Sequence, residues 1–537
     1  MLQRLSKNYS IVYIVGALSV IYLAFLLSSA QPGVFFDSDG AVKYIVVKQL
    51  TAGHGFKYID LPQPEWVHQI WADGFFPMKP PFFYPSPEGY LFVFPPGFQI
   101  LSSFFYAWLG NPGLYVIPVL STLLLWLSMV LLLKRCDVAP TRIAAGLFVL
   151  VFCSPLTIYG ATYWEHMTAT FLLFIGMVYV VRPPEAWVGT DRDAGPMIWR
   201  TRGMAVALGM GLLSGLAAWL RPEAMMMNLL YGLATAVLFF RERQRSSVAF
   251  AVGLAVGIGS FLLFNKIEFD SFFGVHSRQV LQDSVEGGVE VNSWKNLLAI
   301  NQINIHYYLF ALLVLPVVYL LVKARKKLAL RTKLLIGIIL AYCVLTPFMV
   351  PNDGGRQWGA RYFLPIVTVV LVALLLVEKE WGIFGRASVV SGVRAEAGDG
   401  RWKYSGWLLA IVLVFAAISF RRNTYNGGVK TLYWENHHRI SPSMNFVQQQ
   451  PSKVVVVAYP YIAMELGYLF DQRYFFLAPD DSSLHRLLPL LKAKGVREYT
   501  YIYDVRRPLV RPKMLTDTVA GWPKDQGDFE FRKYLIQ

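Results

Sequence analysis

Two carboxylates, Asp37 and Asp39, lie directly after the first apolar run of the chain, residues 11–29. That run is long enough to cross a bilayer, so both acids follow a membrane exit. In residues 41–50, the apolar side chains fall mainly on one helical side and two lysines on another, which predicts an amphipathic helix lying on the membrane. A carboxylate held there at headgroup depth could act on a reactive group carried by a lipid.

A structural role explains the same two acids. Asp is a preferred N-cap residue, so Asp37 and Asp39 could simply cap the amphipathic helix. Two acids two positions apart are a weak motif, and the choice between capping and chemistry depends on the rest of the chain.

The composition is that of a polytopic membrane protein. Of 537 residues, 55% are hydrophobic and only 16% are charged. The first apolar run is expected to be a retained helix and not a cleaved signal peptide. The net charge of +16 does not indicate a nucleic-acid partner, because the basic residues cluster between apolar runs as membrane topology requires. The three cysteines share no metal-ligand spacing.

Hydropathy predicts about eleven membrane spans. Lys and Arg concentrate in the segments on the side of the N-terminus, which places that terminus inside and residues 421–537 outside. The expected spans are residues 11–29, 114–133, 140–156, 164–181, 203–220, 224–240, 247–264, 306–322, 333–350, 361–377 and 404–420.

We therefore expect two domains. Residues 1–420 form an α-helical transmembrane domain, in which residues 30–113 are a large first outer loop with interfacial helices, one of them Phe98–Leu109. From residue 421 the pattern alternates as strand, helix, strand, helix, strand, which predicts a small extracytoplasmic α/β domain of parallel type. It has no phosphate-cradling Gly loop and no nucleophile elbow, so a structural or acceptor-docking role is expected for it.

The unusual polar residues at the membrane ends, those outside the basic clusters of the inner segments, fall on the predicted outer side, and ionisable groups at that depth are functional candidates. Each has a structural alternative: Arg221 and Glu223 could pair with each other, His166 could be an interface histidine, and Arg361 could anchor a span. Their convergence under an aromatic loop favours a site, since arginines bind phosphate bidentately. The candidates are Asp37, Asp39, Glu165, His166, Arg221, Glu223, Arg356 and Arg361, with His276 and Arg278 in the loop 265–305.

Four short motifs, in order, resemble the polyprenyl-phosphate-sugar-dependent glycosyltransferases of the GT-C superfold, which include protein O-mannosyltransferases and the lipid A aminoarabinose transferase. The resemblance covers about the first 380 residues, and in the acidic motif Gly40 stands where the family has its second acid. The motifs are Asp39-Gly40-Ala41-Val42-Lys43-Tyr44, Phe94-Pro95-Pro96-Gly97, Leu220-Arg221-Pro222-Glu223 and the run from Gly354 to Pro365.

The resemblance implies an inverting sugar transfer at the extracytoplasmic face of the bacterial plasma (inner) membrane. Asp39 would be the catalytic base, with Asp37 second, and Arg361, Arg356 and Arg221 would bind the donor phosphate. Glu165, His166, His276 and Arg278 would be substrate-binding residues. The implied partners are a polyprenyl-phosphate-linked sugar, a lipid, glycan or protein acceptor, and membrane lipids. The sequence contains no recognisable metal-binding motif, although Asp37 and Asp39 could hold a divalent ion.

Two other functions fit a chain of this class. A flippase or transporter for a lipid-linked saccharide would be expected to have internal repeats and polar or broken helices at the midplane. A non-catalytic assembly partner could retain the fold, although the presence of Asp39 argues against it.

Overall fold

The structure is a computed structural model of the chain. It describes residues 2–36, 38–80, 82–184, 196–275, 277, 328–349, 361–381, 413–414, 416–425, 427–504 and 529–536.

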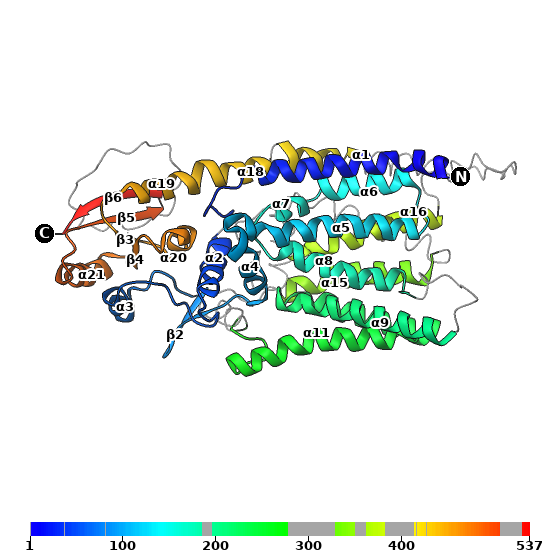
Figure 1. The fold of residues 1–537 in the computed structure, drawn as a ribbon, viewed down its shortest axis with the longest axis horizontal. Coiled ribbons are helices and arrows are strands. Elements are labelled where there is room, and N and C mark those ends of the chain that lie inside the picture. Colours follow the sequence, from blue (N-terminus) through cyan, green and yellow to red (C-terminus); the bar gives the residue numbers. More distant parts are fainter. Residues whose placement is uncertain are drawn as a thin grey trace.

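The described residues form a bundle of long, roughly parallel helices with a smaller α/β layer beyond one end (Figure 1). The N-terminus lies at the opposite end of the bundle. The bundle helices are α1 (Leu2–Leu27), α5 (Val116–Arg135), α6 (Pro140–Phe152), α8 (His166–Val181), α9 (Pro196–Gly215), α10 (Ala224–Glu242), α11 (Ser246–Phe269), α15 (Leu330–Met349) and α16 (Leu364–Trp381).

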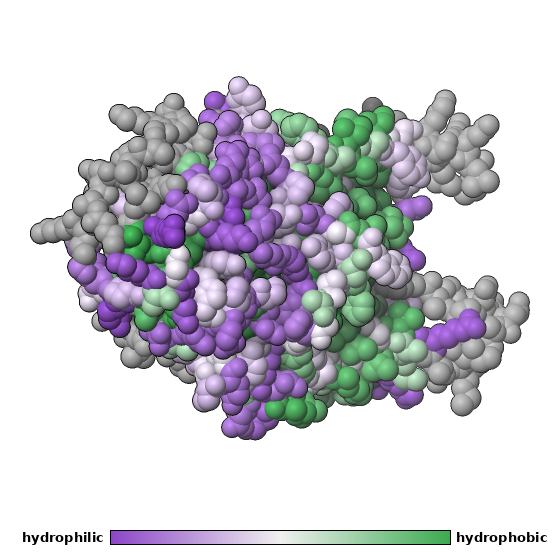
Figure 2. Space-filling view, turned by 60° about the vertical axis from the view of Figure 1, so that its left-hand side comes forward, coloured by the Kyte–Doolittle hydropathy of each residue, from purple (hydrophilic) through white to green (hydrophobic). Residues whose placement is uncertain are grey.

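The predicted fold class, an α-helical polytopic membrane protein, is confirmed. Six helices of the described part are long and apolar enough to cross a membrane, and α6 and α8 are shorter apolar helices. Each predicted span within the described residues coincides with one of the bundle helices. The span 306–322 and most of 404–420 lie outside the described residues, so the number of eleven stays a prediction. Hydrophobic residues gather over the bundle and hydrophilic ones over the α/β end (Figure 2).

Two helices lie across the end of the bundle, α2 (Ser38–Thr51) and α4 (Gly97–Leu109) (Figure 1). Helix α4 matches the predicted helix Phe98–Leu109 and exposes large apolar side chains such as Phe104 and Trp108. The other elements near this end are α3 (Glu65–Ile70), η1 (Trp71–Phe75), β1 (Phe83–Ser86), β2 (Gly89–Phe92), η2 (Asn111–Tyr115), α7 (Leu156–Gly160), η4 (Leu216–Trp219) and η6 (Arg361–Phe363).

The expectation that residues 41–50 lie on the membrane with a polar side in water is wrong. Every residue of α2 from Ser38 to Val47 is buried. One apolar side of the helix, with Val42 and Ile45, joins a core formed with the C-terminal segment. The other, with Ala41 and Tyr44, packs against Phe98 and Tyr163. Protein therefore packs against α2 on both sides, whereas the amphipathic pattern predicts that one side faces water.

The C-terminal segment follows the predicted order of strands and helices. Its sheet has the strand order β4-β3-β5-β6, in which β3 is parallel to β4 and β5 and the edge strand β6 is antiparallel, so the sheet is mixed and not purely parallel. The bounds are η7 (Arg421–Tyr425), α18 (Gly428–Trp434), η8 (Glu435–Ile440), α19 (Ser441–Gln449), β3 (Val454–Val457), α20 (Pro460–Glu465), η9 (Gly467–Leu469), β4 (Tyr474–Leu477), α21 (Asp481–Ala493), β5 (Glu498–Asp504) and β6 (Phe529–Leu535).

This segment shares one hydrophobic core with the loop after the first span. The core combines Val455 and Ile502 of the sheet with Trp71 and Phe83 of the loop. Trp71 also donates a hydrogen bond from its indole nitrogen to the Phe475 carbonyl oxygen at 2.9 Å. The apolar contacts of this core join residues on both sides of the predicted boundary between 1–420 and 421–537. The division into two domains stays a prediction.

Helices α9 and α11 cross at glycines, and α11 also packs against η4, which precedes the turn that carries Arg221. Gly211 and Gly215 of α9 face Gly253 and Gly257 of α11 with a spacing of four residues. A Cβ atom built on Gly257 would lie 2.8 Å from the Gly215 Cα atom and 2.8 Å from the Leu212 carbonyl oxygen. Small residues at this spacing let two helix backbones approach closely in a membrane.

We expect Gly257→Ala to lower the melting temperature of the purified protein, because the added methyl meets backbone that cannot move aside; overpacking of this kind costs about 1–3 kcal/mol. Gly259→Ala on the same helix is the matched control, since nothing lies within 4 Å of a Cβ there. It is expected to be neutral or slightly stabilising, because Ala favours helices more than Gly does. Equal melting temperatures for both variants would contradict the close crossing.

Candidate active site

The candidate site lies at the end of the bundle that α2 covers. Four elements each contribute ionisable side chains: the first turns of α2, the residues where α8 begins, the turn between η4 and α10, and η6 before α16. These elements are far apart in the sequence but meet because α8 packs against both α16 and η4. The side chains are Asp39, Lys43, Glu165, His166, Arg221, Glu223 and Arg361.

Asp39 forms an ion pair with Arg361. Its Oδ2 atom lies 3.2 Å from Nη1 of Arg361, and Asp39 is only 5% exposed. Asp39 is the second residue of α2, so it lies inside the first turn and not at the N-cap. A carboxylate in a first helical turn is also stabilised by the helix dipole. The capping explanation therefore does not account for the direction in which this side chain points.

Glu165 stands between two cations. Its Oε2 atom is 2.5 Å from Nζ of Lys43, and its Oε1 atom is 3.4 Å from Nη1 of Arg221. The other end of the Arg221 guanidinium pairs with Glu223 at 3.0 Å, which confirms the predicted ion pair of this turn. Burial lowers the pKa of Arg221, but the charges of Glu223 and Glu165 raise it by more, so Arg221 stays a cation.

His166 completes the cluster beside Arg221. Its Nε2 atom accepts a hydrogen bond from the Arg221 guanidinium, and the side chain is almost fully buried. Its Nδ1 atom lies 3.7 Å from Oε1 of Glu165 and makes no hydrogen bond within the described part of the chain. The Nε atom of Arg361 is likewise buried with no hydrogen-bond partner among the described residues.

A small cavity lies beside these two unpaired atoms. It encloses about 20 Å³, and its lining includes His166, Arg221, Tyr342, Arg361 and Tyr362. That volume is roughly the space that one water molecule needs. A phosphate or a sugar ring would require the side chains around it to move apart.

The structure brings together six of the predicted site residues: Asp39, Glu165, His166, Arg221, Glu223 and Arg361. The other four, Asp37, Arg356, His276 and Arg278, lie outside the described residues and stay predictions. Within the described ranges, no three His, Cys, Asp or Glu side chains are grouped as they would be around a metal ion.

Two site residues were missed in the sequence. Lys43 was assigned to the polar side of an exposed helix, yet it is 1% exposed and faces Glu165. Its spacing of four residues from Asp39 was the available signal, because positions i and i+4 share one face of a helix. Tyr362 was missed as well; its ring centroid lies 5.3 Å from the Arg361 guanidinium carbon and 5.5 Å from that of Arg221.

The sequence matches no family model and no curated relative. Among solved structures, the chain is similar to ArnT from Cupriavidus metallidurans bound to undecaprenyl phosphate, with 14% identity, a TM-score of 0.53 and 98% of both chains covered. The apo state of the same ArnT gives 14% identity, the same coverage and a TM-score of 0.51. The oligosaccharyltransferase AglB from Archaeoglobus fulgidus is 11% identical over 92% of this chain and 70% of that chain, with a TM-score of 0.48.

At this level of identity the likeness to ArnT shows the fold. ArnT has the GT-C fold, so the predicted resemblance is confirmed at the level of fold. The matched region covers 98% of the chain and so extends past the first 380 residues, which carry the sequence motifs, into the C-terminal segment. The protein is thus an integral multi-pass membrane protein with the GT-C architecture.

Proposed function

We propose that this protein is a membrane glycosyltransferase that moves a sugar from a polyprenyl-phosphate donor to a hydroxyl group of an acceptor. The acceptor is a lipid, a glycan or a protein, and the reaction takes place at the extracytoplasmic face of the membrane. The fold shared with ArnT, a protein solved with undecaprenyl phosphate, supports the donor class.

The observation that carries this proposal is the pairing of Asp39 with Arg361 at the covered end of the bundle. A carboxylate and a guanidinium that face each other 3.2 Å apart can exchange partners when an anion arrives. The donor phosphate would take the bidentate fork of Arg361, and Asp39 would then be free to accept a proton. The unpaired Nε of Arg361 is a further donor that an anion can use.

The proposed transfer needs only the acceptor, the donor and the residues described above. Asp39 removes the proton of the acceptor hydroxyl as its oxygen forms a bond to the anomeric carbon of the donor sugar. The bond between that carbon and the phosphate oxygen breaks, and polyprenyl phosphate leaves with the bonding electron pair. Arg361 and Arg221 stabilise the negative charge that develops on the leaving phosphate. Attack opposite the phosphate inverts the anomeric configuration.

Asp39→Asn is expected to lower transfer at least about a hundredfold, because the amide keeps the size of the side chain but cannot take a proton. Release of undecaprenyl phosphate from a panel of undecaprenyl-phosphate-linked glucose, mannose and galactose, in membranes that supply the acceptor hydroxyl, measures the reaction. Asp60→Asn is the control, since Asp60 is exposed and pairs with His54 away from the site. A near wild-type rate in Asp39→Asn, with the protein folded and inserted, would exclude Asp39 as the base.

Arg361→Lys is expected to impair the reaction nearly as much as Arg361→Ala, because a single ammonium cannot reproduce the bidentate contact of a guanidinium with phosphate. The loss should appear as weaker binding of undecaprenyl phosphate, measured by calorimetry on the purified protein. Arg331→Lys serves as the matched control, since Arg331 pairs with Glu242 away from the site. Unchanged binding in Arg361→Ala would remove Arg361 from the phosphate site.

A cysteine placed at Gln449, which is exposed in α19, is expected to react with a membrane-impermeant maleimide in intact cells. The reason is that the asymmetry of Lys and Arg places the segment after residue 420 outside. The native Cys136 and Cys153 are buried and Cys343 is half-buried within α15, so the unmodified chain gives the background. Labelling that occurs only after the cells are opened would reverse the topology and place the site on the cytoplasmic side.

A further inference from the structure

We infer that Lys43 is a positioning residue for the base: through its ion pair with Glu165 it fixes α2 against the bundle so that Asp39 stands opposite Arg361. This inference rests on the proposed function for the role of Asp39, but the contact that it describes is independent of the substrate.

Two buried ion pairs hold the same face of α2. Asp39 and Lys43 are one helical turn apart and therefore point to the same side of the helix. Asp39 pairs with Arg361 in η6, and Lys43 pairs with Glu165 directly before α8. Because α8 and α16 pack against each other, both partners belong to one part of the bundle. Two fixed points one turn apart define the rotation of α2 about its own axis as well as its position along it.

The surroundings of Lys43 leave it no other arrangement. The side chain is 1% exposed, and its ammonium lies 2.5 Å from Glu165 and 4.5 Å from the centre of the Phe94 ring. A lysine near a membrane surface normally extends its ammonium to water, but this one points inward. A buried ion pair adds little stability over apolar side chains of the same volume, so we assign this pair a role in orientation and not in stability.

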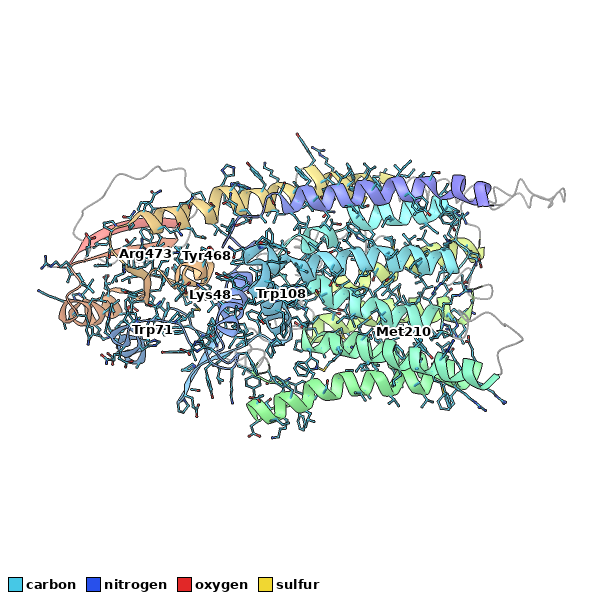
Figure 3. The ribbon with its side chains drawn as sticks, in the orientation of Figure 1. Lys48, Trp71, Trp108, Met210, Tyr468 and Arg473 are labelled. Carbon is cyan, nitrogen blue, oxygen red and sulfur yellow. The ribbon has the colours of Figure 1, made fainter. Side chains whose placement is uncertain are left out.

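A second lysine on α2 provides the contrast. Lys48 pairs with Asp471 of the C-terminal segment, and its side chain is 38% exposed. It lies near Tyr468 at the junction of α2 with that segment (Figure 3). Lys48 follows Lys43 by five residues, which is one helical turn plus somewhat more than a third of the next. Its side chain therefore points away from the face of Lys43. Both lysines have a carboxylate partner, but only Lys43 connects α2 to the bundle.

The test compares Lys43→Met with Lys48→Met in the full-length protein, using the undecaprenyl-phosphate hexose that the wild type consumes. Misplacement of a catalytic group by an ångström costs about a hundredfold in rate, so Lys43→Met is expected to lower kcat by about tenfold to a hundredfold. The KM for the donor should change by less than about threefold, because Arg361 and Arg221 remain. Lys48→Met should keep the kcat of the wild type.

A second variant separates position from stability. Lys43→Met leaves Glu165 with one cation fewer and is expected to lower the melting temperature. Glu165→Gln in the same chain removes the excess charge and should restore it. We expect kcat of the double variant to stay low. Full recovery of kcat, or equal kcat in Lys43→Met and Lys48→Met, would overturn the inference.

Hydrogen–deuterium exchange gives a readout that needs no substrate. Amides in the first half of α2 are expected to exchange faster in Lys43→Met, and in the double variant, than in the wild type or Lys48→Met. Unchanged exchange would overturn the inference even if no hexose of the panel were a substrate. Faster exchange in a protein that consumes none of them would support the contact and count against the proposed function alone.

Discussion

Six charged side chains meet beside His166 at the covered end of the bundle, and the local structure depends on the ion pairs between them. Three acids, Asp39, Glu165 and Glu223, face three bases, Lys43, Arg221 and Arg361. Removing a charge from water costs several kcal/mol unless a partner compensates it, so none of these groups can leave its place alone. An anion that enters must therefore displace a carboxylate, and Asp39 is the one whose release would serve the chemistry.

Close packing on the side of α2 away from the charged cluster keeps Asp39 and Lys43 opposite their partners. A Cβ atom built on Gly40 would lie 3.0 Å from the Phe35 Cβ atom, and one on Gly467 would lie 3.1 Å from Cδ1 of Ile45. Helix α2 is thus held in close contact both by the loop before it and by η9 of the C-terminal segment. The segment after residue 427 supports the site from outside, although none of the side chains described in that segment belongs to the charged cluster.

The sequence predicted the bundle well because membrane spans are a local signal, and the polar residues at their ends included six that meet in space. It failed on α2, where apolar and basic residues alternate as they do in a helix on a membrane. The burial of Lys43 depends on Glu165, which is 122 residues away. No periodicity within α2 contains that contact, and the shared core of the loop and the C-terminal sheet is equally non-local. The antiparallel strand β6 was not predicted either, because nothing in the sequence of β5 indicates that another strand pairs with it.

The distribution of buried charge also bears on the choice between transfer and transport. Among the described residues, the buried acidic, lysine and histidine side chains of the bundle and of α2 lie at the two ends of the bundle: Asp39, Lys43, Glu165 and His166 at the end covered by α2, and Glu378 near the other end of α16. Glu378 pairs with Arg142 at 2.7 Å, so it is compensated where it stands. A transporter places its binding groups near the midplane, where both sides of the membrane can reach them in turn. A cluster confined to one end, beneath a helix held from two sides, suits the proposed transfer at a single face, in which the lipid part of the donor would remain in the bilayer while only its phosphate and sugar would reach Arg361 and Asp39.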